Sequence, residues 1–383
     1  MRIGITLFFF FAAYGVGNVT LPLILRNMGY SVFHTGILMG VFETAGIVGP
    51  LVANSYIEKT GKYGLSFLVM AFIMMLLPIP LVLLRGWWWT ALCLVIFAVS
   101  LRGSVPLADS ITTKLLGDRT NLYGVVRCAG SAGYVIMVLI VQFFSDFARP
   151  MPPLQTMLWL AIPALPFVII LLMLPGFLQT KTEPTAEQRT DKRPGIFSVF
   201  QGFSRTYWAG ILMIFLGFLA LSPANRLLPL YVEEYLGLHA SAGLYALSAG
   251  AEIPAFLFSR RILKSIRGMT MLRLCTAAIV VRMSLYILFP GLAGTVCAQL
   301  MHFATYGLLH PAAIVFCNQN APRGKALTSI SIYQILAGGL ANVLGATIGG
   351  AVIERFGYPT LFISCAILPL FALALNIILG KKS

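Results

Sequence analysis

The sequence predicts an all-α membrane protein in which twelve transmembrane helices form two bundles of six. Three observations support this prediction. First, 58% of the 383 residues are hydrophobic and only 10% are charged, and the mean hydropathy of +0.88 is far above that of soluble globular proteins. Second, apolar stretches long enough to cross a bilayer recur along the whole chain. Third, one long polar interval divides these stretches into two sets of equal size.

The apolar stretches follow one another with only short polar breaks. A spanning helix needs roughly 20 apolar residues, and each stretch is long enough to cross. We expect the first to be retained, because its apolar run is too long for a signal peptide and no small-residue cleavage site follows it. The twelve predicted spans are 3–25, 33–57, 63–84, 88–112, 121–145, 153–175, 206–232, 240–262, 269–289, 293–317, 326–350 and 358–380.

The longest polar interval runs from Gln179 to Arg205 and separates the sixth span from the seventh. It predicts three regions: an N-terminal six-helix bundle at 1–178, a cytoplasmic linker at 179–205 and a C-terminal six-helix bundle at 206–383. The spans leave no room for a soluble catalytic domain, so we expect neither an enzyme nor a cofactor or metal site. The chain also lacks a GxxxxGK[ST] phosphate-binding loop, which excludes self-contained ATP-driven transport.

The net charge of +15, from 27 Lys and Arg against 12 Asp and Glu, would suggest nucleic acid in a soluble protein. Here most basic residues fall on loops of one side, the side of the long interval. By the positive-inside rule that side is cytoplasmic, so we expect both termini in the cytoplasm, a bacterial inner (plasma) membrane location, and no nucleic-acid partner. The chain is expected to be a monomer in the lipid bilayer. Trp87, Trp88 and Trp89 are placed at the outer boundary, where aromatic rings anchor helices.

Three residues of the first two spans recur in the seventh and eighth spans at one constant offset of 207 residues. Such a repeat predicts two parallel halves related by an axis along the membrane normal, with a substrate site between them near the midplane. Chance recurrence in helices rich in Gly and Pro is the alternative. The matched pairs are Asn18 and Asn225, Pro22 and Pro229, and Gly36 and Gly243.

The loop after the second span contains an acidic residue, a basic residue and a turn-permitting glycine: Glu58, Lys59, Gly61 and Lys62. This pattern resembles, in degenerate form, the loop signature of the major facilitator superfamily, which implies the major facilitator fold. In physical terms, the pattern places an acid at a helix end and a glycine in the turn. Its cations can then hold one half of the protein against the other. The equivalent loop of the second half, at 259–268, keeps the basic residues and loses the acid.

Ionisable side chains within the spans are the strongest functional signal. Each costs roughly 2.5 to 3.5 kcal/mol at a helix centre, so the set must face partners, water or a ligand. Static ion pairs would explain single residues, whereas a polar cavity explains all of them. The seven residues are Glu43, Arg102, Asp109, Arg127, Arg226, Glu252 and Arg282.

Two polar stripes follow from helical spacing. The fifth span carries Arg127, Ser131 and Tyr134 on one face. The tenth span carries Gln299, His302, Tyr306 and His310. Because histidine changes its charge near neutral pH, the second stripe suits proton handling.

The run from Tyr123 to Tyr134 resembles the fifth helix of the lactose permease and phenylpropionate permease branch of the superfamily. The resemblance implies that Arg127 binds substrate together with Asp109, which lies 18 residues earlier. It also implies that Arg282 and His302, 20 residues apart, act in recognition and proton coupling.

The run around Glu252 resembles the eighth helix of the phenylpropionate-type permeases. The sequence departs from lactose permease where a glutamate carries the proton, because Thr305 stands there. The proton would then be carried by Glu252, Asp109, Glu43 or His302.

These observations predict a secondary active transporter of a small sugar, nucleoside or organic anion, coupled to proton symport and working by alternating access. A proton-antiport exporter and a non-transporting receptor or scaffold with the same fold are the alternatives. The predicted proton-coupling residues are Glu252, Glu43 and His302. The predicted substrate-binding residues are Arg127, Asp109, Tyr134, Arg282, His302, Asn225 and Arg226.

Overall fold

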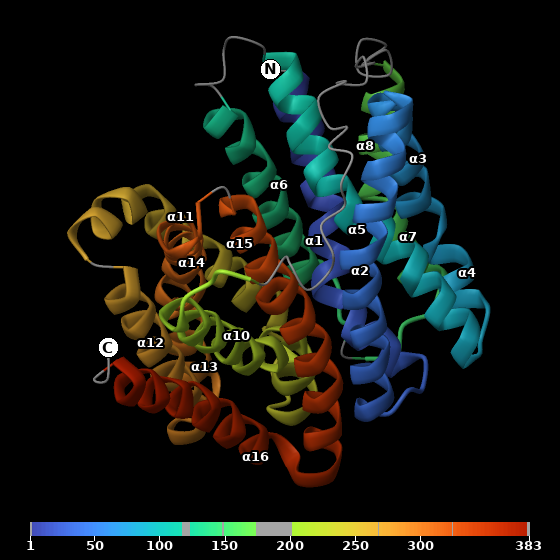
Figure 1. The fold of residues 1–383 in the computed structure, drawn as a ribbon. Helices are drawn as coiled ribbons and strands as arrows, with labels where there is room; N and C mark the ends of the chain where they lie inside the picture. Colours follow the sequence, from blue (N-terminus) through green and yellow to red (C-terminus); the bar gives the residue numbers. More distant parts are fainter. Residues whose placement is uncertain are drawn as a thin grey trace. The chain divides into compact units, whose positions relative to one another are not determined.

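The computed structural model describes residues 2–116, 123–147, 149–173, 201–266, 268–323 and 325–380. Within these ranges the backbone forms helices joined by short connections, and no strand occurs (Figure 1). The all-helical prediction is therefore confirmed. Most of the predicted linker at 179–205 lies outside the described residues, so its boundaries stay a prediction.

The first six predicted spans appear as helices, two of which are interrupted. The third span divides where Pro78 begins a new helix, and the sixth divides around Pro163, because proline lacks the N–H that a continuous helix needs. The helices are α1 (Arg2–Asn27), α2 (Val32–Thr60), α3 (Tyr63–Leu76), α4 (Pro78–Leu83), α5 (Trp87–Leu116), α6 (Tyr123–Phe144), α7 (Pro153–Ala161) and α8 (Ala164–Met173).

The remaining helices contain three π-helical segments, η4, η5 and η6. The last helix, α16, turns at Gly357, whose φ of 81° lies in the left-handed region that favours glycine. The elements are α10 (Arg205–Arg226), η4 (Leu230–Tyr235), α11 (Ser241–Ser265), α12 (Gly268–Leu288), α13 (Leu292–Leu300), η5 (Phe303–Leu308), α14 (Leu309–Asn320), α15 (Ala326–Tyr333), η6 (Gln334–Leu340) and α16 (Ala341–Gly380).

Ten helical stretches of the described chain are long and apolar enough to cross a membrane. One of them, Thr328–Ile378, contains the turn at Gly357 and therefore holds two helices. The predicted eighth span corresponds to α11, which is helical and is not among the ten. The number of twelve spans stays a prediction.

The described residues fall into two compact units. The first lies within Met1–Ser31, Val41–Arg189 and His239–Ala246, and the second within Val32–Gly40, Thr190–Leu238 and Leu247–Ser383. The start of α2 thus belongs to the second unit, and the segment leading into α11 belongs to the first. These two exchanged segments begin at Val32 and His239, separated by the same 207 residues as the sequence repeat.

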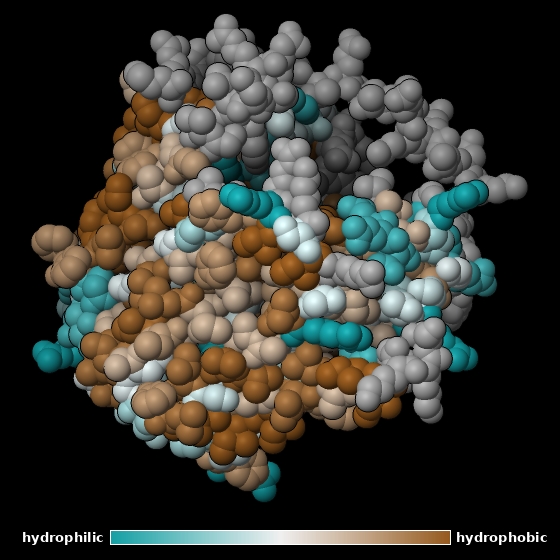
Figure 2. All heavy atoms as spheres, turned by 90° about the vertical axis from the view of Figure 1, so that its left-hand side faces the viewer, coloured by the Kyte–Doolittle hydropathy of each residue, from teal (hydrophilic) through white to brown (hydrophobic). Residues whose placement is uncertain are grey.

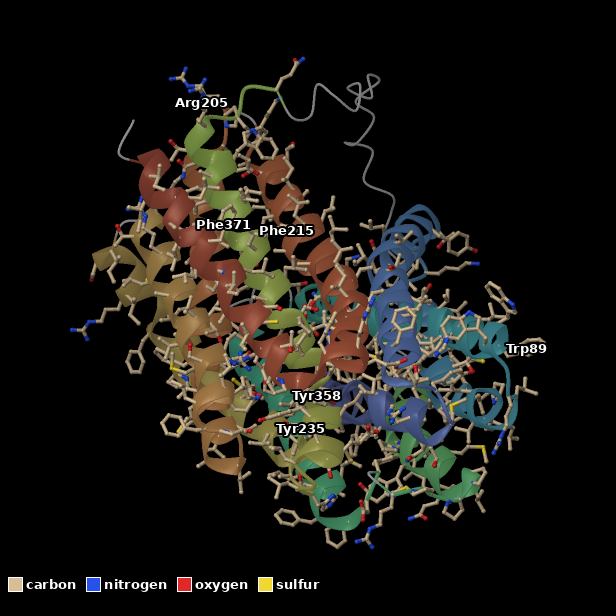
Figure 3. The ribbon with its side chains drawn as sticks, turned by 90° about the horizontal axis from the view of Figure 1, so that it is seen from below. Trp89, Arg205, Phe215, Tyr235, Tyr358 and Phe371 are labelled. Atoms are coloured by element: carbon tan, nitrogen blue, oxygen red, sulfur yellow. The ribbon has the colours of Figure 1, made fainter. Side chains whose placement is uncertain are left out.

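Large apolar side chains point outward from the helices. Figure 2 shows one face covered largely by hydrophobic residues. Phe371 of α16 is 58% exposed. Trp89 is 53% exposed and projects away from the start of α5 (Figure 3). An exterior of this kind suits the lipid bilayer, since contact with lipid costs apolar side chains nothing.

Candidate substrate and proton sites

The second unit contains a buried arginine that is held entirely by neutral acceptors in the contacts described. Arg282 of α12 is fully buried. One guanidinium nitrogen donates to Nδ1 of His302 at 2.8 Å and to Oγ1 of Thr305 at 3.0 Å. The other donates to Oδ1 of Asn225 at 3.0 Å and to Oε1 of Gln299 at 3.2 Å. These four side chains fix the guanidinium in one orientation.

His302 connects Arg282 to an acid. Its Nε2 lies 2.8 Å from Oε1 of Glu252, on α11. Because the guanidinium can only donate, Nδ1 of His302 must accept, and the ring proton is then on Nε2, which donates to the Glu252 carboxylate. The guanidinium keeps its proton, and His302 has no free acceptor. Of these three side chains, Glu252 is therefore the one that can take up a proton.

The local backbone positions these groups. The π-helical segment η5 begins directly after His302, and it places Thr305 toward Arg282. Single turns of π-helix occur often at functional sites. Gln299 also donates to the hydroxyl of Tyr286 at 2.8 Å, and the Tyr286 ring stacks on Phe362 with centroids 4.4 Å apart. Packing therefore fixes the amide of Gln299, which faces the guanidinium.

A second charged pair occupies the first unit. Nε of Arg127, on α6, lies 3.5 Å from Oδ1 of Asp109, on α5, with side chains 30% and 36% exposed. The Arg127 guanidinium also lies over the ring of Phe11, 4.0 Å from its centroid. About two turns further along α6, the hydroxyl of Tyr134 accepts from Asn18 at 3.5 Å. This partly open set offers charged and hydroxyl groups to a polar solute.

Glu43 of the first unit forms an ion pair of its own. It is 1% exposed, and its Oε1 accepts from Arg102 at 2.6 Å. The Arg102 guanidinium also lies 5.5 Å from the ring centroid of Phe42. Glu43 is therefore half of a buried ion pair between α2 and α5, a contact that the sequence spacing did not predict. Its predicted role in proton coupling stays a prediction.

The remaining predicted residues are placed as follows. Gly61 adopts a φ of 66°, so the turn between α2 and α3 uses the left-handed conformation that glycine permits. Lys62 is exposed at the start of α3. The side chains of Glu58 and Lys59 lie outside the described part of the chain. Arg226 ends α10, next to Asn225, and is half-buried.

Sequence reasoning missed the part played by two residues. Thr305 stood out only as a departure from lactose permease and Gln299 only as a member of the polar stripe, whereas both accept hydrogen bonds from Arg282. The spacing of three residues on either side of His302 was the signal that could have identified them, because such positions share one helix face. As neutral acceptors, Thr305 and Gln299 give the arginine polar partners without an opposite charge.

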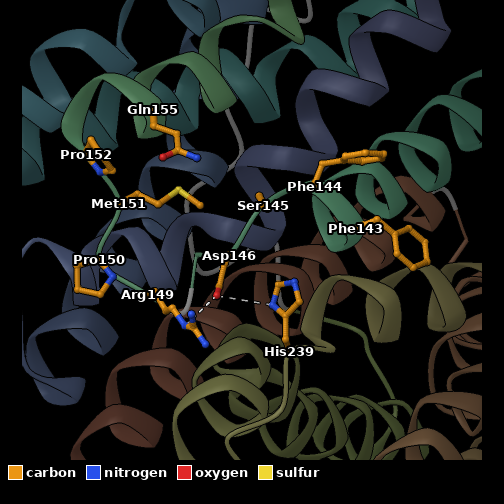
Figure 4. A pocket seen from close by; sticks show the side chains of 10 residues that line it. All are labelled: Phe143, Phe144, Ser145, Asp146, Arg149, Pro150, Met151, Pro152, Gln155 and His239. Atoms are coloured by element: carbon orange, nitrogen blue, oxygen red, sulfur yellow. Dashed lines mark ion pairs between the residues drawn. The ribbon is translucent and has the colours of Figure 1, made fainter.

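A pocket in the first unit is formed by the end of α6, the connection to α7 and His239 (Figure 4). Its volume is about 660 Å³. At its rim Asp146 lies 3.2 Å from Arg149 and 3.8 Å from Nδ1 of His239. Gln142 donates to the backbone oxygen of His239 at 2.7 Å and accepts from the amide of Gly243 at 2.7 Å. None of the predicted site residues lines this pocket.

The fold is that of a major facilitator transporter. A crystal structure of the nucleoside transporter NupG superposes with a TM-score of 0.79 at 14% identity, covering 99% of this chain and 98% of that chain. A transporter of the POT family in complex with a thioalcohol-conjugated peptide gives a TM-score of 0.73 at 14% identity, covering 100% and 95%. At these identities the likeness concerns the fold.

The family is shown by the sequence comparisons. The model of the MFS_1 like family matches residues 1–364, so this chain belongs to that family. A maltose permease of Geobacillus stearothermophilus is 24% identical over 285 residues, which cover 73% of this chain and 68% of that protein. An uncharacterised transporter of Bacillus subtilis, YwbF, is 21% identical over 283 residues, which cover 72% and 67%. The chain is an integral, multi-pass membrane transporter.

Proposed function

We propose that this transporter carries a small, neutral, hydroxyl-rich solute of the sugar or nucleoside class together with a proton, by alternating access. The observation that carries the proposal is the series of contacts from Arg282 through His302 to Glu252. Glu252 is 23% exposed, so water and solute can reach it, whereas the fixed charge of Arg282 is buried.

The charge balance explains how a proton could be coupled to movement. An unprotonated Glu252 carries its charge next to His302, and a charge within a membrane helix is costly to move. Protonation neutralises Glu252, weakens its attraction to the imidazole and lowers that cost. Glu252 is therefore proposed to be the residue that binds the transported proton, in place of the glutamate that Thr305 replaces.

The same geometry favours a neutral solute over an organic anion. Arg282 is enclosed by His302, Thr305, Asn225 and Gln299, and Arg127 already faces Asp109. Both guanidinium groups therefore already have side-chain partners, which leaves neither of them open to the carboxylate of an anionic solute. An Arg–Asp pair that is about a third exposed offers both donors and acceptors to hydroxyl groups. The maltose permease and the nucleoside transporter described above support this class.

The location follows from charge. We propose a bacterial plasma membrane with both termini cytoplasmic, because most basic residues of the loops lie on the side of the termini. We also propose that the transporter is a monomer.

Binding of solute can be measured as thermal stabilisation of the purified protein by maltose, uridine and phenylpropionate. We expect maltose or uridine to raise the melting temperature, and Arg127→Ala to abolish the shift. Arg149→Ala is the matched control, because that arginine is 86% exposed beside Asp146. Stabilisation of Arg127→Ala equal to wild type would refute the assigned site, and a response to phenylpropionate alone would refute a neutral solute.

A further inference from the structure

A second histidine lies on the same helix face as His302, about two turns further along. His302, Tyr306 and His310 form a row of nearly parallel rings. The ring centroids are 5.4 Å and 5.8 Å apart, with interplanar angles of 10° and 7°. The row begins next to Glu252, which pairs with His302. The proposed protonation of Glu252 makes no use of His310, although the His310 side chain is only partly buried.

His310 has a specific polar partner. Its Nδ1 lies 2.6 Å from the hydroxyl of Tyr333, at the end of α15. The Tyr333 side chain is 3% exposed and packs edge-on against Phe218 of α10, with centroids 6.2 Å apart. Two helices therefore hold this hydroxyl in place.

The Tyr333 hydroxyl can fix the tautomer of the His310 imidazole. If Nδ1–H donates to the Tyr333 oxygen, Nε2 is the nitrogen left to bind and release a proton. The same hydrogen bond then holds in the neutral ring and in the imidazolium. Protonation would require no rearrangement around Tyr333.

The charges around the two histidines differ. His302 faces Glu252 on α11 and Arg282 on α12, so a second proton on its ring would meet a guanidinium 2.8 Å away. His310 faces the hydroxyl of Tyr333 on α15 and the ring of Tyr306, and Phe218 of α10 packs against both tyrosine rings. Among the contacts described for His310 there is no cation, so a second proton on its ring meets no guanidinium such as the one that faces His302.

We propose that His310 is a second proton-binding residue, positioned by Tyr333, which passes the proton between the solution and Glu252. The proposal rests on the proposed proton coupling. Nε2 of neutral His310 takes a proton from water, and the N–H bond formed there breaks when the proton moves to the Glu252 carboxylate. His310 returns to its neutral form, and one proton has been transferred. Tyr333 takes no part in the transfer beyond holding Nδ1.

Proton binding can be observed directly, without a substrate. The chain has four histidines, so histidine labelled with 13C at Cε1 gives four NMR signals that single His→Gln variants assign. We expect the His310 signal to shift as the pH is lowered, because a proton binds to its ring. Tyr333→Phe should move its midpoint. Tyr231→Phe, which removes a hydroxyl from a tyrosine packed against Tyr235 and Phe362, should not. A His310 signal that stays constant would overturn the proposal.

Transport assays distinguish a role of His310 in proton transfer from a purely structural role. In proteoliposomes, His310→Gln and Tyr333→Phe should lose most uptake of labelled maltose or uridine driven by a pH gradient. Exchange of the same solute across the membrane without a gradient should persist, because exchange needs no net proton movement. Unchanged driven uptake, or an equal loss of exchange, would contradict the role of His310. If the wild type accumulates neither solute, the proposed function fails, while the NMR titration still decides whether His310 binds a proton.

Discussion

At the scale of residues, the buried ion pair between Glu43 and Arg102 should contribute more to stability than the exposed pair between Asp146 and Arg149. Glu43 is 1% exposed and its partner is 2.6 Å away. Removing one member of a buried pair leaves the other charge without its counterion, whereas exposed pairs contribute little. Stability measurements on the two pairs therefore test whether Glu43 is structural.

We predict that Glu43→Leu lowers the free energy of unfolding by about 3 kcal/mol, near the lower end for a broken buried pair because Arg102 keeps some exposure. Adding Arg102→Met should recover much of that loss, since both charges are then absent. Asp146→Asn serves as the control and should change stability by about 1 kcal/mol or less. Melting temperatures in detergent measure all three, and a double variant less stable than Glu43→Leu would contradict the prediction.

Some of these contacts could be predicted from the sequence and others could not. Arg127 with Asp109 and Arg282 with His302 were matched by spacing and resemblance, and the structure brings each pair together. The pairing of Glu43 with Arg102 depends on the register between two separate helices, which periodicity within one helix does not contain. The contact between His310 and Tyr333 depends on the helix register in the same way.

At the scale of elements, α1 and α6 approach closely because α6 carries glycine at the contact. A Cβ atom built on Gly133 would overlap the backbone carbonyl of Phe8. Backbone cannot yield as a flexible side chain can, so α1 would have to move away. A Cβ atom built on Gly250 of α11 would have nothing within 4 Å, which makes this glycine a matched control in another helix.

We therefore predict that Gly133→Ala destabilises the protein by about 1–3 kcal/mol, the usual cost of overpacking. Gly250→Ala should be neutral or slightly stabilising, because alanine favours the helix by about 0.5–1 kcal/mol. Thermal melting of the two variants beside wild type tests the claim. Equal melting temperatures for both variants would show that the contact between α1 and α6 does not depend on glycine.

The helices also show where sequence patterning stops being informative. The apolar stretches predicted the position of nearly every helix, because lipid requires long runs of apolar residues. The π-helical segments at Phe303–Leu308 and Gln334–Leu340 left no such signal. Hydropathy does not distinguish a π-helical turn from the α-helix on either side of it.

At the scale of the whole molecule, the predicted repeat can be compared with the two compact units. Asn18 and Asn225 each hydrogen-bond a polar partner of their own unit, Tyr134 and Arg282 respectively. The segments exchanged between the units begin at Val32 and His239, at the same offset of 207 residues. Agreement between the two offsets supports a parallel repeat of two halves over a chance recurrence of residue types.

The orientation in the membrane is testable by labelling. In a variant without its six native cysteines, a cysteine at Arg149 should react with a membrane-impermeant maleimide added to intact cells, because that residue is 86% exposed on the predicted outer side. A cysteine at Lys62, on the predicted cytoplasmic side, should react only after the cells are permeabilised. The opposite pattern would mean that the termini are outside and that the positive-inside assignment is wrong.

The central claim is that solute and proton move together, with Glu252 binding the proton. The most direct measurement is uptake of labelled maltose and uridine into proteoliposomes under an imposed inward proton gradient. The account predicts accumulation of one of these solutes, its loss on adding a protonophore, and exchange without driven uptake in Glu252→Gln. Accumulation that is unaffected by collapsing the gradient, or that proceeds unchanged in Glu252→Gln, would contradict it.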